Sequence, residues 1–168
     1  YTLQIIEDNG SKVGINTHLT NKIFLDGLKN NFLKEFGKNI EIKTEVKFND
    51  NTRFDFLITK NNYKAFVEVK NVTLVRNSKI AEFPDAVTTR GAKHINQLLK
   101  ASRQGYNIFI AFVIQREDCD HFTIASDIDP EYSKLLSNAV KKKLNIICYD
   151  CKFSLKGIKL NKPIKYKI

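Results

Sequence analysis

The stretch NTRFDFLITKNNYKAFVEVKN, residues 51–71, decides the fold. Aromatic and β-branched residues on both sides of Asn61-Asn62 predict two antiparallel strands, over residues 53–59 and 63–70. The two asparagines suit the positive φ angles of a two-residue type I′ turn. A turn of that length fixes which residues face one another along the whole hairpin.

The register that this turn imposes brings charged residues together on one face of the sheet, because side chains alternate between faces. On that face we expect the pairs Leu57–Phe66, Asp55–Glu68 and Arg53–Lys70. The opposite face is expected to be core and carries Phe54, Phe56, Ile58, Ala65, Val67 and Val69.

Two carboxylates in directly opposite positions destabilise a sheet, since their Cβ atoms lie roughly 5 Å apart. A divalent cation between Asp55 and Glu68 would reverse that effect, and hard ions such as Mg²⁺ take oxygen ligands. Lys70, two residues beyond Glu68, could then orient a water or stabilise a phosphate oxygen. The alternative is an exposed set of ion pairs, Asp55 with Arg53 and Glu68 with Lys70. The residues alone leave both interpretations open.

The segments around the hairpin extend it to the order α-β-β-β-α-β-α-β, an α/β domain with a mixed sheet over residues 1–168. Helices are expected over residues 17–31, 88–104 and 129–144, with caps at Thr17, Thr88 or Thr89, and Asp129. Further strands are expected over residues 1–6, 40–48, 107–115 and 145–153. We expect residues 71–87 to be irregular and the tail from Gly157 to hold one short strand at most.

The net charge of +10 favours a polyanionic partner, nucleic acid before others. Scattered lysines can also reflect codon bias and form only a solvated surface, which would suit a protein-interaction domain. The three cysteines form an odd set, which favours a reducing compartment and a cytoplasmic location. Cys148 and Cys151 have metal-like spacing, but on a strand they face opposite sides. No apolar run is long enough to cross a membrane.

Longer motifs carry a resemblance to a known family. GINTH (14–18), RFDFLI (53–58), VEVKNVTLV (67–75), FPDAVTTRGAKH (83–94), FVIQR (112–116) and DIDPEYSKLL (127–136) resemble the sugar fermentation stimulation protein A family. An Asp, a hydrophobic hairpin and Glu-x-Lys, in this order of elements, also resemble the PD-(D/E)XK nuclease superfamily. The resemblance implies a restriction-endonuclease-like core. It also implies an N-terminal OB-like domain, which we expect to be missing here because the chain contains no Met.

The resemblance implies a DNA-binding protein with Mg²⁺ or Mn²⁺ as cofactor and a nuclease-like activity. By the superfamily pattern Asp55 and Glu68 would be metal ligands and Lys70 the catalytic lysine. Glu45 resembles a position that the family keeps acidic, and it is a third candidate ligand. A glutamate from the first helix, frequent in the superfamily, has no matching position here. The second hypothesis is therefore a DNA-binding regulator of sugar metabolism genes without catalysis.

Further residues are candidates for holding DNA. In the predicted second helix, Arg90, His94 and Gln97 share one face, and a helix start favours phosphate. The alternative is a capped helix with a solvated side. The full set of DNA-binding candidates is Arg53, Arg90, Lys93, His94, Gln97, Asn16 and Thr17, of which the last two rest on the resemblance. The sequence indicates no particular oligomeric state.

Overall fold

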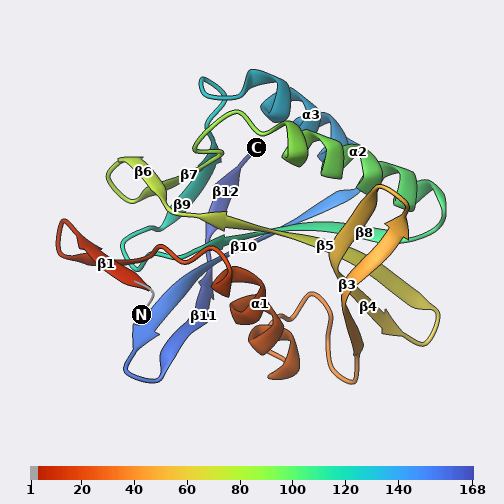
Figure 1. Cartoon of the computed structure of the whole chain (residues 1–168), viewed down its shortest axis with the longest axis horizontal. Coiled ribbons are helices and arrows are strands. Elements are labelled where there is room, and N and C mark those ends of the chain that lie inside the picture. Colours follow the sequence, from red (N-terminus) through yellow and green to blue (C-terminus); the bar gives the residue numbers. More distant parts are fainter. Residues whose placement is uncertain (1–3) are drawn as a thin grey trace.

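A six-stranded mixed sheet lies between helices in the computed structural model, which describes residues 4–168 (Figure 1). The helices are α1 (Leu19–Lys29), α2 (Thr89–Arg103) and α3 (Pro130–Lys141). In spatial order the strands of the main sheet are β11 (Gly157–Pro163), β10 (Leu144–Ser154), β8 (Asn107–Ile114), β5 (Tyr63–Val72), β4 (Thr52–Lys60) and β3 (Glu41–Asn49). Figure 1 shows α2 and α3 on one side of this sheet and α1 on the other.

Two smaller sheets complete the described chain. One pairs β1 (Ile5–Asp8) with β2 (Ser11–Gly14). The other has the order β12 (Lys165–Lys167), β9 (His121–Ile124), β7 (Ile80–Phe83) and β6 (Leu74–Asn77). Both are built largely from segments that the sequence analysis treated as connections or as tail.

The main sheet changes from antiparallel to parallel at β5. Strands β3, β4 and β5 form an antiparallel meander, and β5, β8 and β10 are parallel neighbours. Parallel neighbours need crossovers, which α2 and α3 supply. The central strand β8 is buried from Ile108 to Ile114, as its continuous apolar sequence predicts. The expected α/β class with a mixed sheet is therefore confirmed.

Each face of the main sheet has its own core. The core beneath α2 and α3 includes Ile95, Leu98, Tyr132, Leu136 and Phe112. The core beneath α1 includes Ile23, Phe24, Leu28, Phe56 and Val67. The two faces of β10 divide between these cores, so Cys148 and Cys151 lie on opposite sides, as their spacing predicts.

The hairpin has the predicted register, from Lys60–Tyr63 to Phe56–Val67. The ladder of β4 and β5 ends at that last pair, and Arg53 faces Lys47 of β3 rather than Lys70. Asp55 and Glu68 are therefore not partners in this ladder, and that part of the predicted register is wrong. Their side chains nonetheless line one pocket.

The strict alternation predicted for β4 is also wrong at one point. Phe54 is buried in the α2–α3 core, whereas Phe56 is buried in the α1 core. The interruption lies at Asp55 and at its neighbour Glu45 in β3, whose φ is 52°. A left-handed residue inside a strand re-aims the side chains on either side of it. This irregularity gives Asp55 a direction that regular pleating would not give it.

Four other expectations need correction or fall outside the described chain. Residues 71–87 are not irregular, since they include β6 and β7, and the tail holds two strands instead of one. Thr17 does not cap α1, because His18 occupies that position without a side-chain cap bond. The first three residues of the strand expected over 1–6 lie outside the described residues. The predicted caps Thr88 and Asp129 are confirmed.

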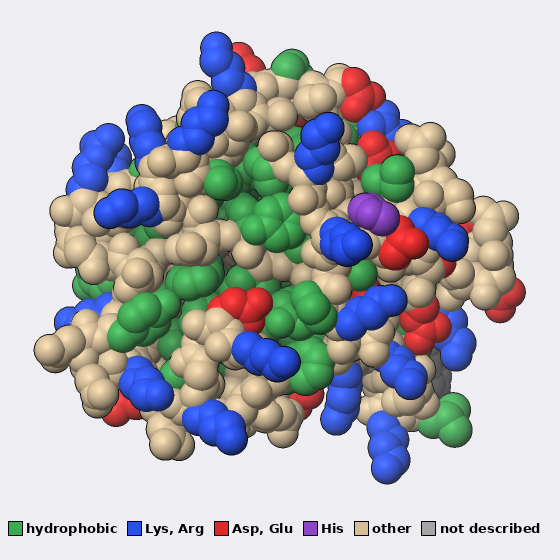
Figure 2. Space-filling view, turned by 180° about the vertical axis from the view of Figure 1, so that it is seen from behind, with side chains coloured by type: hydrophobic (Ala, Val, Ile, Leu, Met, Phe, Trp, Pro, Cys, Tyr) green, Lys and Arg blue, Asp and Glu red, His purple; other side chains and the backbone are tan. Residues whose placement is uncertain are grey.

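Charge is spread over the surface instead of being gathered in one patch on the face that Figure 2 shows. Lys and Arg side chains surround a central area of hydrophobic side chains in that view. Among residues 4–168, no helix is long and apolar enough to cross a membrane.

Candidate active site

An open pocket of about 630 Å³ lies where the starts of α1 and α2 meet the strands of the meander. Its lining is almost wholly polar: Thr17, His18, Thr20, Asn21, Lys22, Thr44, Glu45, Asp55, Glu68, Val69, Lys70, Asn71 and Arg90. The three residues of the predicted catalytic set, and the third candidate ligand Glu45, thus share one pocket. Glu45 is exposed, whereas Glu68 is 4% exposed.

Asp55 is held by one donor on each carboxylate oxygen. Asn21 of α1 donates to Oδ1 at 2.8 Å, and the backbone N–H of Val69 donates to Oδ2 at 2.7 Å. Burial and the neighbouring charge of Glu68 nevertheless raise the pKa of Asp55 to about 6. The carboxylate is therefore oriented for a ligand but carries an electrostatic penalty that a cation would relieve.

Glu68 uses its two oxygens very differently. Oε1 accepts from Nζ of Lys70 at 2.8 Å and contacts Nδ1 of His94. Oε2 is buried and has no hydrogen-bond partner among the described residues. Burial opposes ionisation, but His94 and Lys70 outweigh it, so the pKa of Glu68 lies below its ordinary value. An ionised, buried carboxylate with a free oxygen is an uncommon and costly arrangement.

These residues fit a hard divalent cation. The free Oε2 of Glu68 and the destabilised carboxylate of Asp55 are oxygen donors of the kind that Mg²⁺ and Mn²⁺ prefer. Within residues 4–168, no group of three or more His, Cys, Asp or Glu side chains is placed to hold a metal. Such a cation would therefore retain several waters, as Mg²⁺ usually does.

The predicted DNA-binding residues are only partly brought to this pocket. Arg90 and Thr17 line it, whereas Lys93 and Arg53 are exposed outside its lining. Asn16 is half-buried, and its amide donates to Gln4.

Two predicted members of the α2 face are engaged within the molecule instead. Gln97 accepts from Nδ2 of Asn49 at 2.9 Å. His94 is buried against Glu68, so its ring is not free to hold a phosphate. On this face of α2, His94 and Gln97 therefore contact the strands, whereas Arg90 is exposed and lines the pocket.

Sequence reasoning missed Asn21 and the true partner of His94. Asn21 reaches Asp55 across 34 positions of sequence, and His94 reaches Glu68 across 26. Helical periodicity placed His94 beside the apolar stripe of its helix, on a face expected to border the site and hold DNA, which was the one available signal. No pattern in the sequence distinguishes Asn21 from the other polar residues of its helix.

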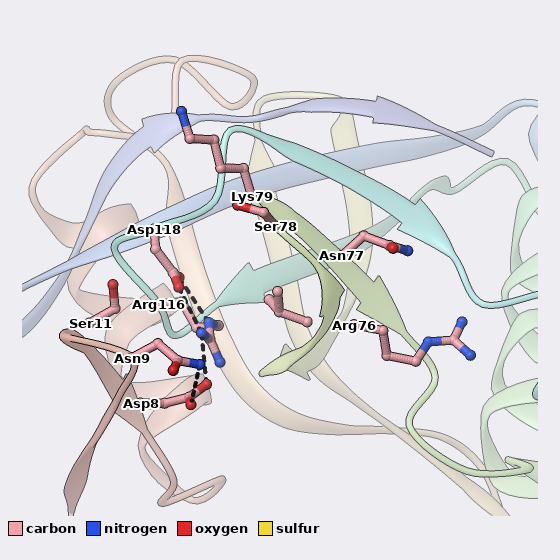
Figure 3. A pocket seen from close by; sticks show the side chains of 10 residues that line it. Asp8, Asn9, Ser11, Arg76, Asn77, Ser78, Lys79, Arg116 and Asp118 are labelled. Atoms are coloured by element: carbon pink, nitrogen blue, oxygen red, sulfur yellow. Dashed lines mark hydrogen bonds and ion pairs between the residues drawn. The ribbon is translucent and has the colours of Figure 1, made fainter.

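A second polar pocket, of about 540 Å³, lies between β1, β6 and the segment after β8 (Figure 3). Figure 3 shows the buried Arg116 between Asp8 and Asp118, with Arg76 directed away from them. Arg116 donates to both carboxylates and to the carbonyl of Thr73. Its donors are thus used within the fold, which makes this pocket a structural ion-pair cluster.

Comparison with known proteins adds a consistent set of similarities. Residues 18–157 match the family model described as the sugar fermentation stimulation protein RE domain. A sugar fermentation stimulation protein homolog of Pelagibacter ubique is 52% identical over 98% of this chain and 71% of its own length. The Bartonella quintana homolog is 39% identical over 94% and 68%. A structure of Pyrococcus furiosus SfsA in complex with Ca²⁺ superimposes with a TM-score of 0.90, at 29% identity over 100% of this chain and 72% of that one.

Proposed function

The chain belongs to the sugar fermentation stimulation protein family, and on that premise we propose that it is a DNA-binding, metal-dependent nuclease with a PD-(D/E)XK-type core. The observation that carries this proposal is that Glu68, which lines the same pocket as Asp55, has a buried oxygen, Oε2, without a hydrogen-bond partner among the described residues. Burial of a carboxylate oxygen without a donor costs folding free energy, and such an arrangement is typical of a functional site.

Asp55 and Glu68 would hold Mg²⁺ or Mn²⁺, with Glu45 at the rim as a further acidic group. A bound divalent ion polarises a phosphoryl oxygen and lowers the pKa of a coordinated water. The Ca²⁺ in the Pyrococcus furiosus protein's structure supports a divalent ion in this family.

The chain's own residues bind and orient the substrate. Lys70, whose side chain is 13% exposed, would offer its ammonium to the attacking water and to the charge that develops on the phosphate. A water oxygen would bond to phosphorus and release one proton to solvent as the P–O3′ bond breaks, and the departing O3′ would take up one proton from solvent. Arg90 and the positive net charge would hold the backbone without reading sequence. The free, buried cysteines suit a reducing cytoplasm.

Nicking of supercoiled plasmid DNA tests the proposal. With Mg²⁺ or Mn²⁺ the wild-type protein is expected to produce open circles, and with EDTA it is not. Lys70→Ala is expected to abolish nicking while DNA binding in a gel-shift assay survives. Lys64→Ala, an exposed position on the same strand, is the matched control and should nick like the wild type. Failure of the wild type to nick with any divalent metal would exclude the nuclease.

A second candidate function is a DNA-binding regulator of sugar metabolism genes that uses the same fold without catalysis. Two observations favour it. First, Nζ of Lys70 donates to Glu68. Second, no third acidic residue joins Asp55 and Glu68 to form a metal-binding group among residues 4–168. The two functions separate in the same assay, because a regulator shifts DNA and leaves the plasmid supercoiled.

A further inference from the structure

His94 and Lys70 converge on the same oxygen of Glu68. Nδ1 of His94 and Nζ of Lys70 both reach Oε1, while Oε2 stays buried and unpaired within the described chain. A carboxylate that only needed neutralising would gain more from one donor on each oxygen, because each buried lone pair without a donor costs free energy. The one-sided arrangement therefore leaves Oε2 as the oxygen without a donor among the described residues.

The ring of His94 is fixed by its surroundings. It lies on α2 at 8% exposure, and its plane is at 82° to that of Phe54, with ring centroids 6.5 Å apart. To donate to a carboxylate, Nδ1 must carry the proton. Helix α2 thus presents one N–H to Glu68 from a position that does not depend on substrate.

Lys70 differs from His94 in the flexibility of its side chain and in lining the pocket. Its side chain ends in an ammonium on a flexible four-carbon stem and is partly exposed to the pocket. In the proposed reaction this ammonium turns towards the phosphate and the attacking water. Oε1 would then lose one of its two donors, and His94 is the donor that stays.

We infer that His94 is a positioning residue of the proposed active site, which holds Glu68 by Oε1, leaves Oε2 for a divalent cation and keeps Oε1 paired when Lys70 turns to the substrate. The inference rests on the proposed function, because it needs a cation at Glu68. It assigns to His94 a role in metal affinity instead of DNA contact. Removing a partner that orients a metal ligand typically lowers metal affinity or activity about 10–100-fold.

Mn²⁺ affinity of the full chain, measured by the electron paramagnetic resonance signal of free Mn²⁺, tests the inference without turnover. His94→Leu and His94→Phe both remove the donor, and Phe keeps a ring against Phe54. Both are expected to bind Mn²⁺ roughly 10–100-fold more weakly than the wild type. His94→Asn keeps an N–H at a similar distance from the backbone and should restore affinity to within a few fold. Ile95→Val, a buried change on the same helix, should bind like the wild type.

The outcomes separate the two proposals. Equal Mn²⁺ affinity of the donorless variants and the wild type would overturn the role of His94. Folding of His94→Asn alone, with both donorless variants unfolded, would show a purely structural role and overturn it too. Mn²⁺ binding that follows the expected order without any plasmid nicking would sustain the positioning role and exclude the nuclease. A wild-type protein that binds no Mn²⁺ would remove the metal site and, with it, both proposals.

Discussion

Oδ2 of Asp55 accepts a hydrogen bond of 2.7 Å from the backbone N–H of Val69. A side chain thereby satisfies a strand N–H at the point where the β4–β5 ladder has already ended, after Phe56–Val67. The N–H of Val69 therefore keeps an acceptor although the β4–β5 ladder has ended. The two strands can separate here without leaving a buried backbone donor unpaired. The pocket lies at this opening, so the position of Asp55 and the shape of the site have one cause.

Asp55→Asn is expected to remove the fall in stability of the metal-free protein between about pH 4 and pH 6. The pKa of Asp55 is raised from 3.8 to about 6, so the folded chain binds this proton more tightly than the unfolded chain. Between about pH 4 and pH 6 stability falls as pH rises, and above that range the loss is complete. Asparagine carries no charge, but it leaves one of the two donors to Asp55 without an acceptor at every pH. Relative to the wild type, the variant should therefore gain roughly 1–3 kcal/mol in the free energy of unfolding between pH 4 and pH 8.

Urea denaturation at both pH values, in EDTA, measures this difference. Addition of Mn²⁺ at pH 8 supplies the control, because it should stabilise the wild type and leave Asp55→Asn nearly unchanged. An Asp55→Asn protein whose stability falls between pH 4 and pH 8 as much as that of the wild type would contradict the raised pKa of Asp55.

Asn21→Ala is expected to raise the pKa of Asp55 further. The hydrogen bond from Asn21 Nδ2 to Oδ1 favours the ionised carboxylate, and its removal leaves burial and Glu68 less opposed. Carboxyl-carbon NMR titration of the metal-free protein measures the shift directly. Asn30→Ala, at the other end of α1, removes a similar bond to Asp26 and should leave Asp55 unchanged. A titration curve of Asp55 that is the same in all three proteins would refute the contact.

Asp129→Ala is expected to lower the free energy of unfolding by more than the loss of an ordinary helix cap does. The carboxylate, 4% exposed, accepts from the N–H of Tyr132 in α3 and also from the N–H of Thr88, the cap of α2. A typical cap is worth about 1 kcal/mol, and a second buried donor left unpaired adds about 1–3 kcal/mol. We expect a loss of roughly 2–4 kcal/mol in the free energy of unfolding.

Thr88→Ala is the natural comparison, because it removes one acceptor only, that of the Gly91 N–H. It should cost about 1 kcal/mol. Equal losses for Asp129→Ala and Thr88→Ala in urea denaturation would show that Asp129 does not link the two helix starts.

The sequence was informative where interactions are local. The Asn61-Asn62 turn set the hairpin register correctly for every pair up to Phe56–Val67, and the caps at Thr88 and Asp129 followed from their positions before apolar helices. The end of the ladder was not predictable, because it depends on the Asp55 side chain replacing a backbone partner. Local patterns carry no information on such substitutions.

Contacts between distant segments could also not be predicted from the sequence. Periodicity placed His94 beside the apolar stripe of its helix, as a candidate for DNA contact, but could not identify Glu68 as its partner. The short strands β6, β7 and β12 lack alternation of their own and depend on β9, which joins β7 and β12. Tertiary pairing of this kind overrides weak local preference.

Arg90 and Lys93 offer a last test, because both are exposed and near the start of α2 but only Arg90 lines the pocket. If DNA crosses the pocket, Arg90 neutralises a phosphate there and Lys93 does not. Each lost phosphate contact reduces the slope of log K against log salt by about one. Arg90→Gln should therefore weaken DNA binding and lower that slope by about one, whereas Lys93→Gln should leave the slope unchanged. Fluorescence-anisotropy titrations of a short duplex across a salt series measure both slopes. Equal slopes for the two variants would mean that DNA is held by the general positive charge of the surface, and that the path through the pocket is wrong.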